Sequence, residues 1–424
     1  MTGAGTASWP DMLRTFGRIG LLSFGGPAAQ IALMHRELVD HKRWLSEDDY
    51  LRALSFCMLL PGPEAMQLAT YAGWRLRGIP GGLLAGLLFV LPGALVILAL
   101  AAAYVHWGSL PTVQALFLGI KACVAVIVVE ALLRVARRAL KGPLQRLIAV
   151  LAFAGIFAFG LPFPLIILLA ALIGILGLTV PTAAMPAPTT DPHGHLPATL
   201  AVGIGLWGAP LLALWLADQT FLLQLGLFFS KLALVTFGGA YAVLAYMTQE
   251  VVQDLGWLTT GQMIDALGLA ETTPGPLILV TEFVGYVAGH GQGGLWLAIS
   301  AAALTLWVTF VPCFLWIFAF APYIDRLTAR PRLQAALAGI TAAVVGVIGS
   351  LSLWFAIHVL FGRVADMRLG PLSLPWPDLT SISLPSLLIM AVAGVLLLKR
   401  HWPLVWVLAL SAALGALTLL LRGA

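Results

Sequence analysis

The chain contains five long stretches without a single Asp, Glu, Lys or Arg residue. They are residues 78–120, 147–190, 192–217, 283–324 and 333–362. Each is long enough for one or two membrane-spanning helices of about 20 residues. Of the 424 residues, 10% are charged and 60% are hydrophobic, against roughly 25% and 45–50% in soluble domains. Because the strands of a membrane barrel alternate apolar and polar residues, these continuous runs predict an all-α integral membrane protein.

The remaining composition excludes several classes of function. A formal net charge of +5 in a membrane protein usually reflects basic cytoplasmic loops, so we expect no nucleic-acid partner. The cysteines Cys57, Cys123 and Cys313 have no paired spacing, which predicts neither a disulfide framework nor a metal site. The start of the chain has no basic segment followed by an apolar core, and we expect no cleaved signal. Without an ATPase or hydrolase motif, neither an enzyme nor a bound cofactor is predicted.

The sequence repeats itself at a constant offset. Ser-Phe-Gly-Gly-Pro at residues 23–27 recurs 213 positions later as Thr-Phe-Gly-Gly-Ala, and the Pro-Gly-Pro at residues 61–63 recurs at the same offset. Further along, Gly119 matches Gly339 at an offset of 220, which a short insertion near residues 289–294 explains. Such self-similarity predicts two homologous units. The predicted organisation is a first repeat over residues 11–180, a linker and connecting transmembrane helix over 181–220, and a second repeat over 221–421.

Matched loops of the two repeats differ in charge. Residues 35–52 carry four Lys or Arg residues, whereas their counterparts at 248–265 carry none. The bias is reversed at residues 104–111, which have none, and 324–331, which have two. Because Lys and Arg are retained on the cytoplasmic side, the repeats are predicted to be inverted. A single connecting helix between them fits inversion, and the total is roughly 9 to 13 membrane segments, with about four spanning helices per repeat.

Two segments in each repeat have helix-breaking residues in the middle of an apolar run. Paired glycines interrupt residues 16–34 and 229–247, and a Pro-Gly-Pro interrupts residues 51–71 and 263–284. Proline removes a backbone donor and blocks the preceding helical turn. Each segment is therefore predicted to form two half-helices that meet at membrane depth, as in a re-entrant hairpin. Irregular backbone is tolerated there only where it is buried in protein or lines a polar cavity.

Such half-helix ends favour an anion. A helix N-terminus presents unpaired N–H groups and about half a positive charge, and glycine lets a ligand approach the backbone closely. Nearby hydroxyls add neutral donors, which suits a tetrahedral oxyanion. The same residues also permit close helix crossing, but their duplication beside proline breaks favours a site. Apart from basic residues, the candidate substrate-binding residues are Ser23, Gly25, Gly26, Pro61, Gly62, Thr236, Gly238, Gly239, Thr272, Thr273 and Gly275.

Two basic residues occupy equivalent positions in the repeats. Arg18 and Lys231 lie five residues before Ser23 and Thr236, respectively. Ionisable residues within membrane segments are costly and are candidates for function. We therefore include Arg18 and Lys231 among the substrate-binding candidates, as sources of positive charge for an anion. The alternative is that their side chains extend to the membrane interface.

Three carboxylates flank the Pro-Gly-Pro motifs. Glu64 follows the first, and Glu271 and Glu282 lie on either side of the second. They are candidates for accepting a coupling proton, because burial favours the neutral form of a carboxyl group. The alternative is that they hold basic residues in salt bridges. Lys121 lies in the middle of a predicted helix, at the position that corresponds to Thr341 in the other repeat. It is expected to pair with a carboxylate.

The chain resembles the chromate transporter family in its long form with two membrane repeats. The resemblance is carried by Ser-Phe-Gly-Gly-Pro at residues 23–27, Trp-Leu at 44–45, Leu-Pro-Gly-Pro at 60–63, Thr-Phe-Gly-Gly-Ala-Tyr at 236–241 and Thr-Thr-Pro-Gly-Pro at 272–276. It covers most of the chain outside the linker and connecting helix. It implies a multi-pass protein of the bacterial inner membrane that exports chromate, coupled to protons, with sulfate as the isosteric competitor.

Other functions stay open at this stage. The acidic residues also suit a carboxylate-lined carrier of cations or amino acids, and another small anion is a further alternative substrate. A membrane enzyme acting on lipid phosphates is disfavoured because no nucleophile or metal constellation is found at membrane depth. The expected partners are a small inorganic oxyanion and the lipid bilayer, and a homodimer is one arrangement considered.

Overall fold

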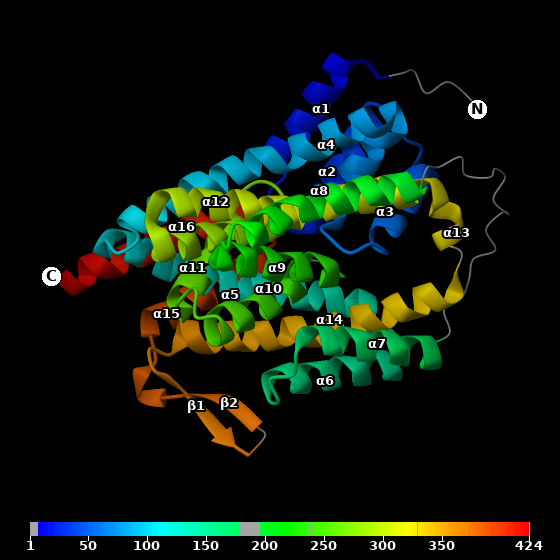
Figure 1. Cartoon of the computed structure of the whole chain (residues 1–424). Helices are drawn as coiled ribbons and strands as arrows, with labels where there is room; N and C mark the ends of the chain where they lie inside the picture. The colour runs from blue at the N-terminus through cyan, green and yellow to red at the C-terminus, as the bar shows by residue number, and fades with distance from the viewer. Residues whose placement is uncertain (1–6, 179–195, 238–239, 329, 371, 424) are drawn as a thin grey trace. The chain divides into compact units, whose positions relative to one another are not determined.

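A computed structural model describes residues 7–178, 196–237, 240–328, 330–370 and 372–423, which are almost entirely helical (Figure 1). In the described residues, five helices are long and apolar enough to cross a membrane, and several shorter apolar helices accompany them. The prediction of an all-α membrane protein is confirmed.

The first repeat begins with two short helices and ends with two apolar ones. In chain order its elements are α1 (Trp9–Leu22), α2 (Gly26–His35), a π-helical turn (Arg36–His41), α3 (Glu47–Cys57), α4 (Glu64–Trp107), α5 (Pro111–Ala139), α6 (Pro143–Phe157) and α7 (Phe163–Gly177). The connecting helix α8 (Leu196–Leu216) follows, and none of its residues is buried.

The second repeat has the same order of main helices, with additional short turns, the short helix α13 and a β-hairpin. In chain order its elements are α9 (Thr220–Val235), α10 (Ala240–Gln249), a π-helical turn (Glu250–Asp254), α11 (Thr260–Thr272), a 3-10 turn (Leu277–Leu279), α12 (Val280–Phe320), a second 3-10 turn (Ala321–Tyr323), α13 (Ile324–Thr328), α14 (Pro331–Leu360), strands β1 (Val364–Leu369) and β2 (Leu372–Pro377), a third 3-10 turn (Leu379–Ser381), α15 (Leu384–Gly394), a π-helical turn (Val395–Lys399) and α16 (Leu404–Gly423).

Local hydrogen bonds confirm the repeat. Each copy has a π-helical turn at the same place. After it, the Trp44 amide donates to the Leu38 carbonyl at 2.8 Å, and the amide of the equivalent Trp257 donates to the Val251 carbonyl at 2.9 Å. Because π-helical turns are rare, their recurrence at the repeat offset shows that both copies share one local structure.

The antiparallel hairpin of β1 and β2 was not predicted. Its residues pair in register from Val364 with Pro377 to Leu369 with Leu372. The sequence reason is visible in retrospect, because polar and apolar residues alternate here and Gly370 adopts a φ of 61° at the turn. The segment follows the last residue of a long charge-free stretch.

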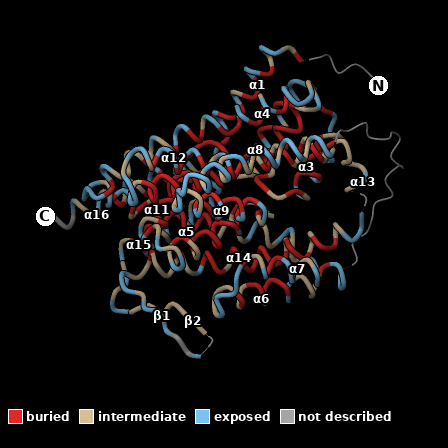
Figure 2. Tube along the Cα trace, viewed as in Figure 1, coloured by how far each residue is buried: buried red, intermediate tan, exposed pale blue. Residues whose placement is uncertain are grey.

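The described helices form two compact units, and neither corresponds to a single repeat. The first contains the described parts of residues 1–102, 180–240 and 273–334, and the second those of 103–179, 241–272 and 335–424. Each unit therefore combines segments from both repeats. Burial follows this division, since the middle of α5 and of α14 in the second unit is largely buried (Figure 2).

Glycines let α5 and α16 pack at backbone contact in the second unit. A Cβ at Gly119 would lie 1.8 Å from the Ser411 carbonyl oxygen, and one at Gly415 would lie 2.2 Å from the Ala115 carbonyl oxygen. Small residues at helix crossings are what holds helices together in lipid, where no hydrophobic force drives them together. The two helices run antiparallel, because residue 119 faces 411 and residue 115 faces 415.

We predict that Gly119→Val destabilises the protein by about 1–3 kcal/mol, the usual cost of overpacking a tight contact. The measurement is thermal unfolding in detergent, followed by intrinsic tryptophan fluorescence. Gly205→Val in α8 is the matched control, because no atom lies within 4 Å of a Cβ built at Gly205. Equal melting temperatures for the two variants would show that the α5–α16 contact does not carry stability.

Candidate functional site

The helix breaks of the first unit are joined in two equivalent pairs. The Gly275 amide donates to the Ser23 carbonyl oxygen at 2.9 Å, and the Gly62 amide donates to the Thr236 carbonyl oxygen at 2.8 Å. The repeat offset carries Ser23 onto Thr236 and Gly62 onto Gly275. Each glycine break thus contacts the Pro-Gly-Pro break of the other repeat, and the prediction that all four segments are broken is confirmed.

Positive φ angles explain why glycine occupies these breaks. Gly62 has a φ of 127° and Gly275 one of 89°, while Gly25 and Gly26 have 86° and 77°. Residues with a Cβ rarely adopt such conformations. A Cβ at Gly25 would meet no atom closer than 3.4 Å, whereas one at Gly62 would lie 2.8 Å from both the Cys313 sulfur and an amide nitrogen. The start of α2 therefore has room for a Cβ, whereas the first Pro-Gly-Pro is tightly packed.

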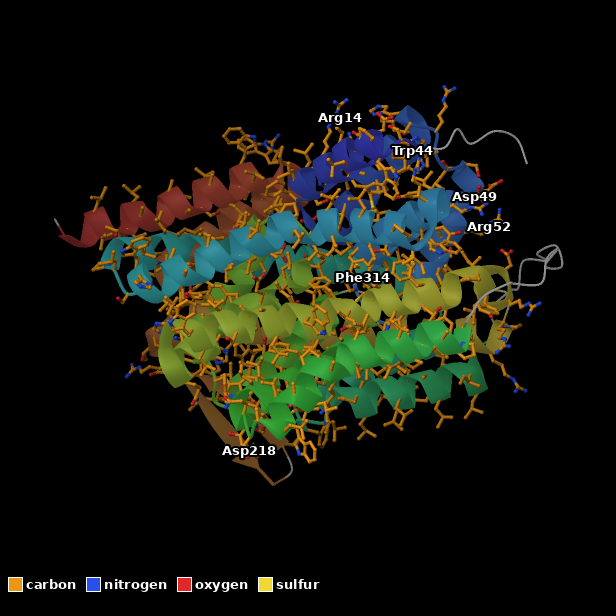
Figure 3. The ribbon with its side chains drawn as sticks, turned by 45° about the horizontal axis from the view of Figure 1, so that its top comes forward. Arg14, Trp44, Asp49, Arg52, Asp218 and Phe314 are labelled. Carbon is orange, nitrogen blue, oxygen red and sulfur yellow. The ribbon has the colours of Figure 1, made fainter. Side chains whose placement is uncertain are left out.

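Helix α4 packs closely on α12 and on the second Pro-Gly-Pro. A Cβ at Gly93 would lie 2.3 Å from the Pro274 carbonyl oxygen, and one at Gly86 would lie 2.4 Å from the ring of Phe314. Phe314 is labelled on α12 in Figure 3. Both long helices also have a non-helical kink at equivalent places, at Arg77–Gly78 in α4 and Gly293–Gly294 in α12. Close helix crossing, which the sequence offered as the alternative to a substrate site, does occur at the second Pro-Gly-Pro.

Hydroxyl groups at the breaks donate back to their own helices. Ser23 Oγ donates to the Ile19 carbonyl oxygen at 2.5 Å, and Thr236 Oγ1 donates to the Leu232 carbonyl oxygen at 2.6 Å. Both side chains are fully buried. Donation of either hydroxyl to a ligand would require rotation about χ1, which exchanges one hydrogen bond for another.

Two glutamines complete the breaks and were missed by the sequence analysis. Gln30 Nε2 donates to the carbonyl oxygens of Ser23 at 3.2 Å and Gly275 at 2.6 Å. Gln67 Nε2 donates to the Pro61 carbonyl oxygen at 2.8 Å. In the part of the chain that the structure describes, the Oε1 atoms of both glutamines are buried without a hydrogen-bond partner.

A signal for these glutamines was present in the sequence. At the repeat offset, Gln30 and Gln67 correspond to Val243 and Val280, respectively. An amide opposite valine in an otherwise matched repeat marks a polar group that the common fold does not need. Comparison of the two copies position by position would have identified both.

Carboxylates lie at the first turn of the helices that follow the Pro-Gly-Pro motifs. Glu64 is in the first turn of α4 and Glu282 in that of α12. The residue Glu282 is 1% exposed, and its Oε2 has no hydrogen-bond partner among the described residues. Glu271 belongs to the second unit, where the Tyr241 hydroxyl hydrogen-bonds to it. Glu64 and Glu282 belong to the first unit.

The basic candidates lie outside the buried breaks. The Arg18 side chain is 63% exposed, and its Nη1 lies 3.4 Å from Oε1 of the buried Glu37. Lys231 is exposed on α9. Lys121 pairs with Asp265, with 2.8 Å between Nζ and Oδ1, which confirms its expected pairing with a carboxylate.

The remaining candidates divide between the units. Thr273 is buried in the first unit. Thr272 ends α11 in the second, and its hydroxyl donates to the Leu269 carbonyl oxygen at 2.8 Å. Gly238 and Gly239 lie outside the described residues.

Comparison with known proteins gives one consistent result. The chromate transporter family model matches residues 10–175 and 223–416, once for each repeat. The chain is 35% identical to a chromate transport protein of Pseudomonas aeruginosa, covering 86% of this chain and 84% of that protein. It is 31% identical to a chromate transport protein of Cupriavidus metallidurans, covering 81% and 82%, and 31% identical to a probable chromate transport protein of Synechococcus elongatus, covering 92% and 95%.

No solved structure matches the chain. Three findings agree on the same family. Each repeat matches the family model, the described residues contain several apolar helices, and the relatives match over most of the chain. These relatives are transport proteins and not enzymes. The chain is a multi-pass membrane protein and belongs to the chromate transporter family.

Proposed function

We propose that this protein is a secondary active transporter that exports chromate, or a similar tetrahedral oxyanion such as sulfate, across the bacterial cytoplasmic membrane, coupled to protons. The observation that carries the proposal is the pair of equivalent hydrogen bonds between the breaks, Gly275 to Ser23 and Gly62 to Thr236. Discontinuous helices held together at a repeat interface are typical of substrate sites in secondary transporters.

The anion is assigned to the helices that follow the glycine pairs. Neither α2 nor α10 has an acidic residue in its first turn, whereas α4 and α12 each have one. A carboxylate in the first turn satisfies the positive end of the helix dipole and opposes a second anion. The room for a Cβ at Gly25 supports a substrate position at the start of α2.

The coupling proton is assigned to Glu282. Its buried Oε2 lacks a partner among the described residues, and an ionised carboxylate without a partner is costly in a low-dielectric interior. Protonation removes that cost and the repulsion of a nearby anion. Glu64 is the second candidate, because it occupies the first turn after the other Pro-Gly-Pro.

Arg18 and Lys231 are assigned to attracting the anion. Both are exposed and equivalent in the repeats, and exposed cations raise the local concentration of an anionic substrate. Arg18 is also partly neutralised by Glu37, which limits its use as a tight ligand.

A carrier of cations is the alternative, and one observation favours it. Three of the unpartnered buried atoms, Gln30 Oε1, Gln67 Oε1 and Glu282 Oε2, are acceptors. Oxygen acceptors bind hard cations. In an oxyanion transporter, Glu282 would bind the coupling proton and the amide oxygens would accept hydrogen bonds from water. Measurement of which ion is transported distinguishes the two functions.

Cells that produce this protein are expected to accumulate less chromate and to tolerate more of it than vector controls. Inverted membrane vesicles should take up chromate when a pH gradient is imposed, with sulfate, molybdate and phosphate as competitors. Sodium chloride or potassium chloride, added in place of the chromate salt, tests whether the cation alone has an effect. Equal chromate content in producing and control cells, with the protein verified in the membrane, would remove chromate as substrate.

Gly62→Ala is expected to reduce chromate uptake at least tenfold, because a Cβ there meets two atoms at 2.8 Å and opposes the φ of 127°, strain of order 1–3 kcal/mol. Gly78→Ala is the matched control, since Gly78 also has a positive φ but no atom within 4 Å of the added Cβ. Uptake is measured in vesicles at equal protein content. The site model fails if both variants transport equally well.

Glu282→Gln is expected to transport chromate at a rate that no longer depends on the pH gradient, because the amide mimics a permanently protonated carboxyl group. Uptake into inverted vesicles is measured with and without the gradient. Glu47→Gln in the exposed first turn of α3 is the control and should retain the dependence. Full gradient dependence in Glu282→Gln would assign the proton elsewhere.

A further inference from the structure

The second unit contains a cavity that the proposed transport site does not use. Its volume is ≈ 370 Å³. The wall is built from the start of α5, the end of α14, the segment before α15 and the end of α16. Its polar lining residues include Gln114, Lys121, His358, Ser383, Ser386 and Thr418. Within this set no side chain is acidic, which is the composition of a site for an anion.

Lys121 supplies the positive charge of the cavity and forms an ion pair with the buried Asp265. Its Nζ lies 2.8 Å from Asp265 Oδ1, and Asp265 Oδ2 accepts a hydrogen bond from the Tyr104 hydroxyl at 2.8 Å. The Asp265 side chain is 3% exposed and that of Lys121 is 20% exposed. An ammonium group has three donors. Asp265 fixes the position of the lysine from the buried side and leaves its remaining donors for a ligand in the cavity.

Hydroxyl groups at the start of α15 also line the cavity. Ser383 caps the first turn of α15, where its Oγ accepts from the Ser386 amide at 3.3 Å and donates to Ser386 Oγ at 2.9 Å. The Ser386 side chain is buried. Ser386 Oγ accepts from Ser383 and lines the cavity, so its own proton can be donated to an oxyanion there. The first turn of α15 has no acidic residue, so its dipole adds to the attraction.

The cavity is not a consequence of the repeat. At the repeat offsets, Lys121 corresponds to Thr341 and Asp265 to Arg52. Arg52 forms its own ion pairs, with Asp49 at 3.4 Å and Asp325 at 3.7 Å. A lysine–aspartate pair that the other repeat replaces with threonine and arginine is not needed to form the common fold. A specific role for this pair explains its presence in one copy.

The distribution of Lys and Arg predicts that the cavity lies on the extracytoplasmic side. Helix α5 runs from the cavity at Pro111 to the basic residues Arg137 and Arg138 in its last turn. The π-helical turn after α15 ends at Lys399, also at the end away from the cavity. Lys and Arg at membrane boundaries are retained in the cytoplasm, so the opposite ends of these helices, with the cavity between them, face outward.

From these observations we propose that the cavity is a second binding site for a small oxyanion, on the extracytoplasmic side, in which Lys121 is shared between Asp265 and the bound ion. The proposal deepens the proposed function, on which it rests, by adding a place where the exported ion stays before release. Sharing with Asp265 lowers the net positive charge of the site. A weak site of this kind releases its ion readily.

The test uses the full-length protein with cysteine introduced at the cavity wall. Ser383→Cys is made in a background in which the three buried native cysteines are replaced by alanine. In right-side-out vesicles, the rate of labelling by a membrane-impermeant anionic thiol reagent is measured with sodium sulfate or with sodium chloride at equal ionic strength. We expect sulfate to slow labelling at least fivefold, and chloride to have no such effect.

Substitutions of the pair move this protection in opposite directions. Lys121→Gln should abolish it, whereas Asp265→Asn should lower the half-protecting sulfate concentration about tenfold, the effect of releasing one charge-assisted hydrogen bond to the ion. Lys399→Gln, at the far end, is the matched control and should behave as the parent. If the pair is only structural, sulfate should fail to protect both Lys121→Gln and Asp265→Asn, and this result would overturn the proposal. Absence of sulfate protection in the parent Ser383→Cys protein would also overturn it.

These outcomes separate the inference from the proposed function, because labelling requires no transport. Protection by sulfate in a protein that fails to move chromate would retain the cavity site and reject the transport proposal. Transport without protection would do the reverse. If Lys121→Gln does not reach the membrane, Lys121→Arg together with Asp265→Asn decides the matter: the proposal requires protection in Lys121→Arg and stronger protection in Asp265→Asn.

Discussion

The need to satisfy backbone groups inside a membrane governs this structure. Each break in a helix exposes amides and carbonyls that water cannot reach, at a cost of several kcal/mol for each unsatisfied group. Here the breaks satisfy one another. The Gly275 amide meets the Ser23 carbonyl and the Gly62 amide meets the Thr236 carbonyl, so neither repeat forms its breaks without the other. This mutual dependence explains why the first compact unit contains segments of both repeats.

Buried amide side chains extend the same principle. Gln30 donates to the carbonyl oxygens of Ser23, at the first glycine break, and of Gly275, at the second Pro-Gly-Pro. Gln67 donates to the carbonyl oxygen of Pro61 at the first Pro-Gly-Pro. In this way the first repeat contributes polar side chains to both pairs of breaks, and the second contributes valine at the corresponding positions. The pairing of backbone groups is therefore symmetric, while the side chains that support it are not.

The four breaks and the helical class followed from the sequence because each depends on residues close together in the chain, and the repeat followed because matching motifs recur at a constant offset. The constant offset from Ser23 to Thr236 and the Pro-Gly-Pro motifs were sufficient. Which break contacts which was not predictable, because the two pairings join residues 252 and 174 positions apart without complementary charge or size. A carboxylate partner for Lys121 was predicted, but the sequence did not identify it as Asp265, which lies near Lys121 only in the folded chain. The orientation of the repeats stays a prediction from loop charge.

Asymmetry between the repeats has a consequence for a transporter. In an inverted repeat, two identical copies would give inward-open and outward-open states of equal energy, since exchange of the copies converts one state into the other. Differences such as Gln30 against Val243, or Asp265 against Arg52, remove that equivalence. Each polar group that has a partner in only one state shifts the balance by its own hydrogen-bond energy, on the order of 1 kcal/mol. If the copies are inverted, the positions where they differ therefore set the resting state, and the positions where they agree form the common site.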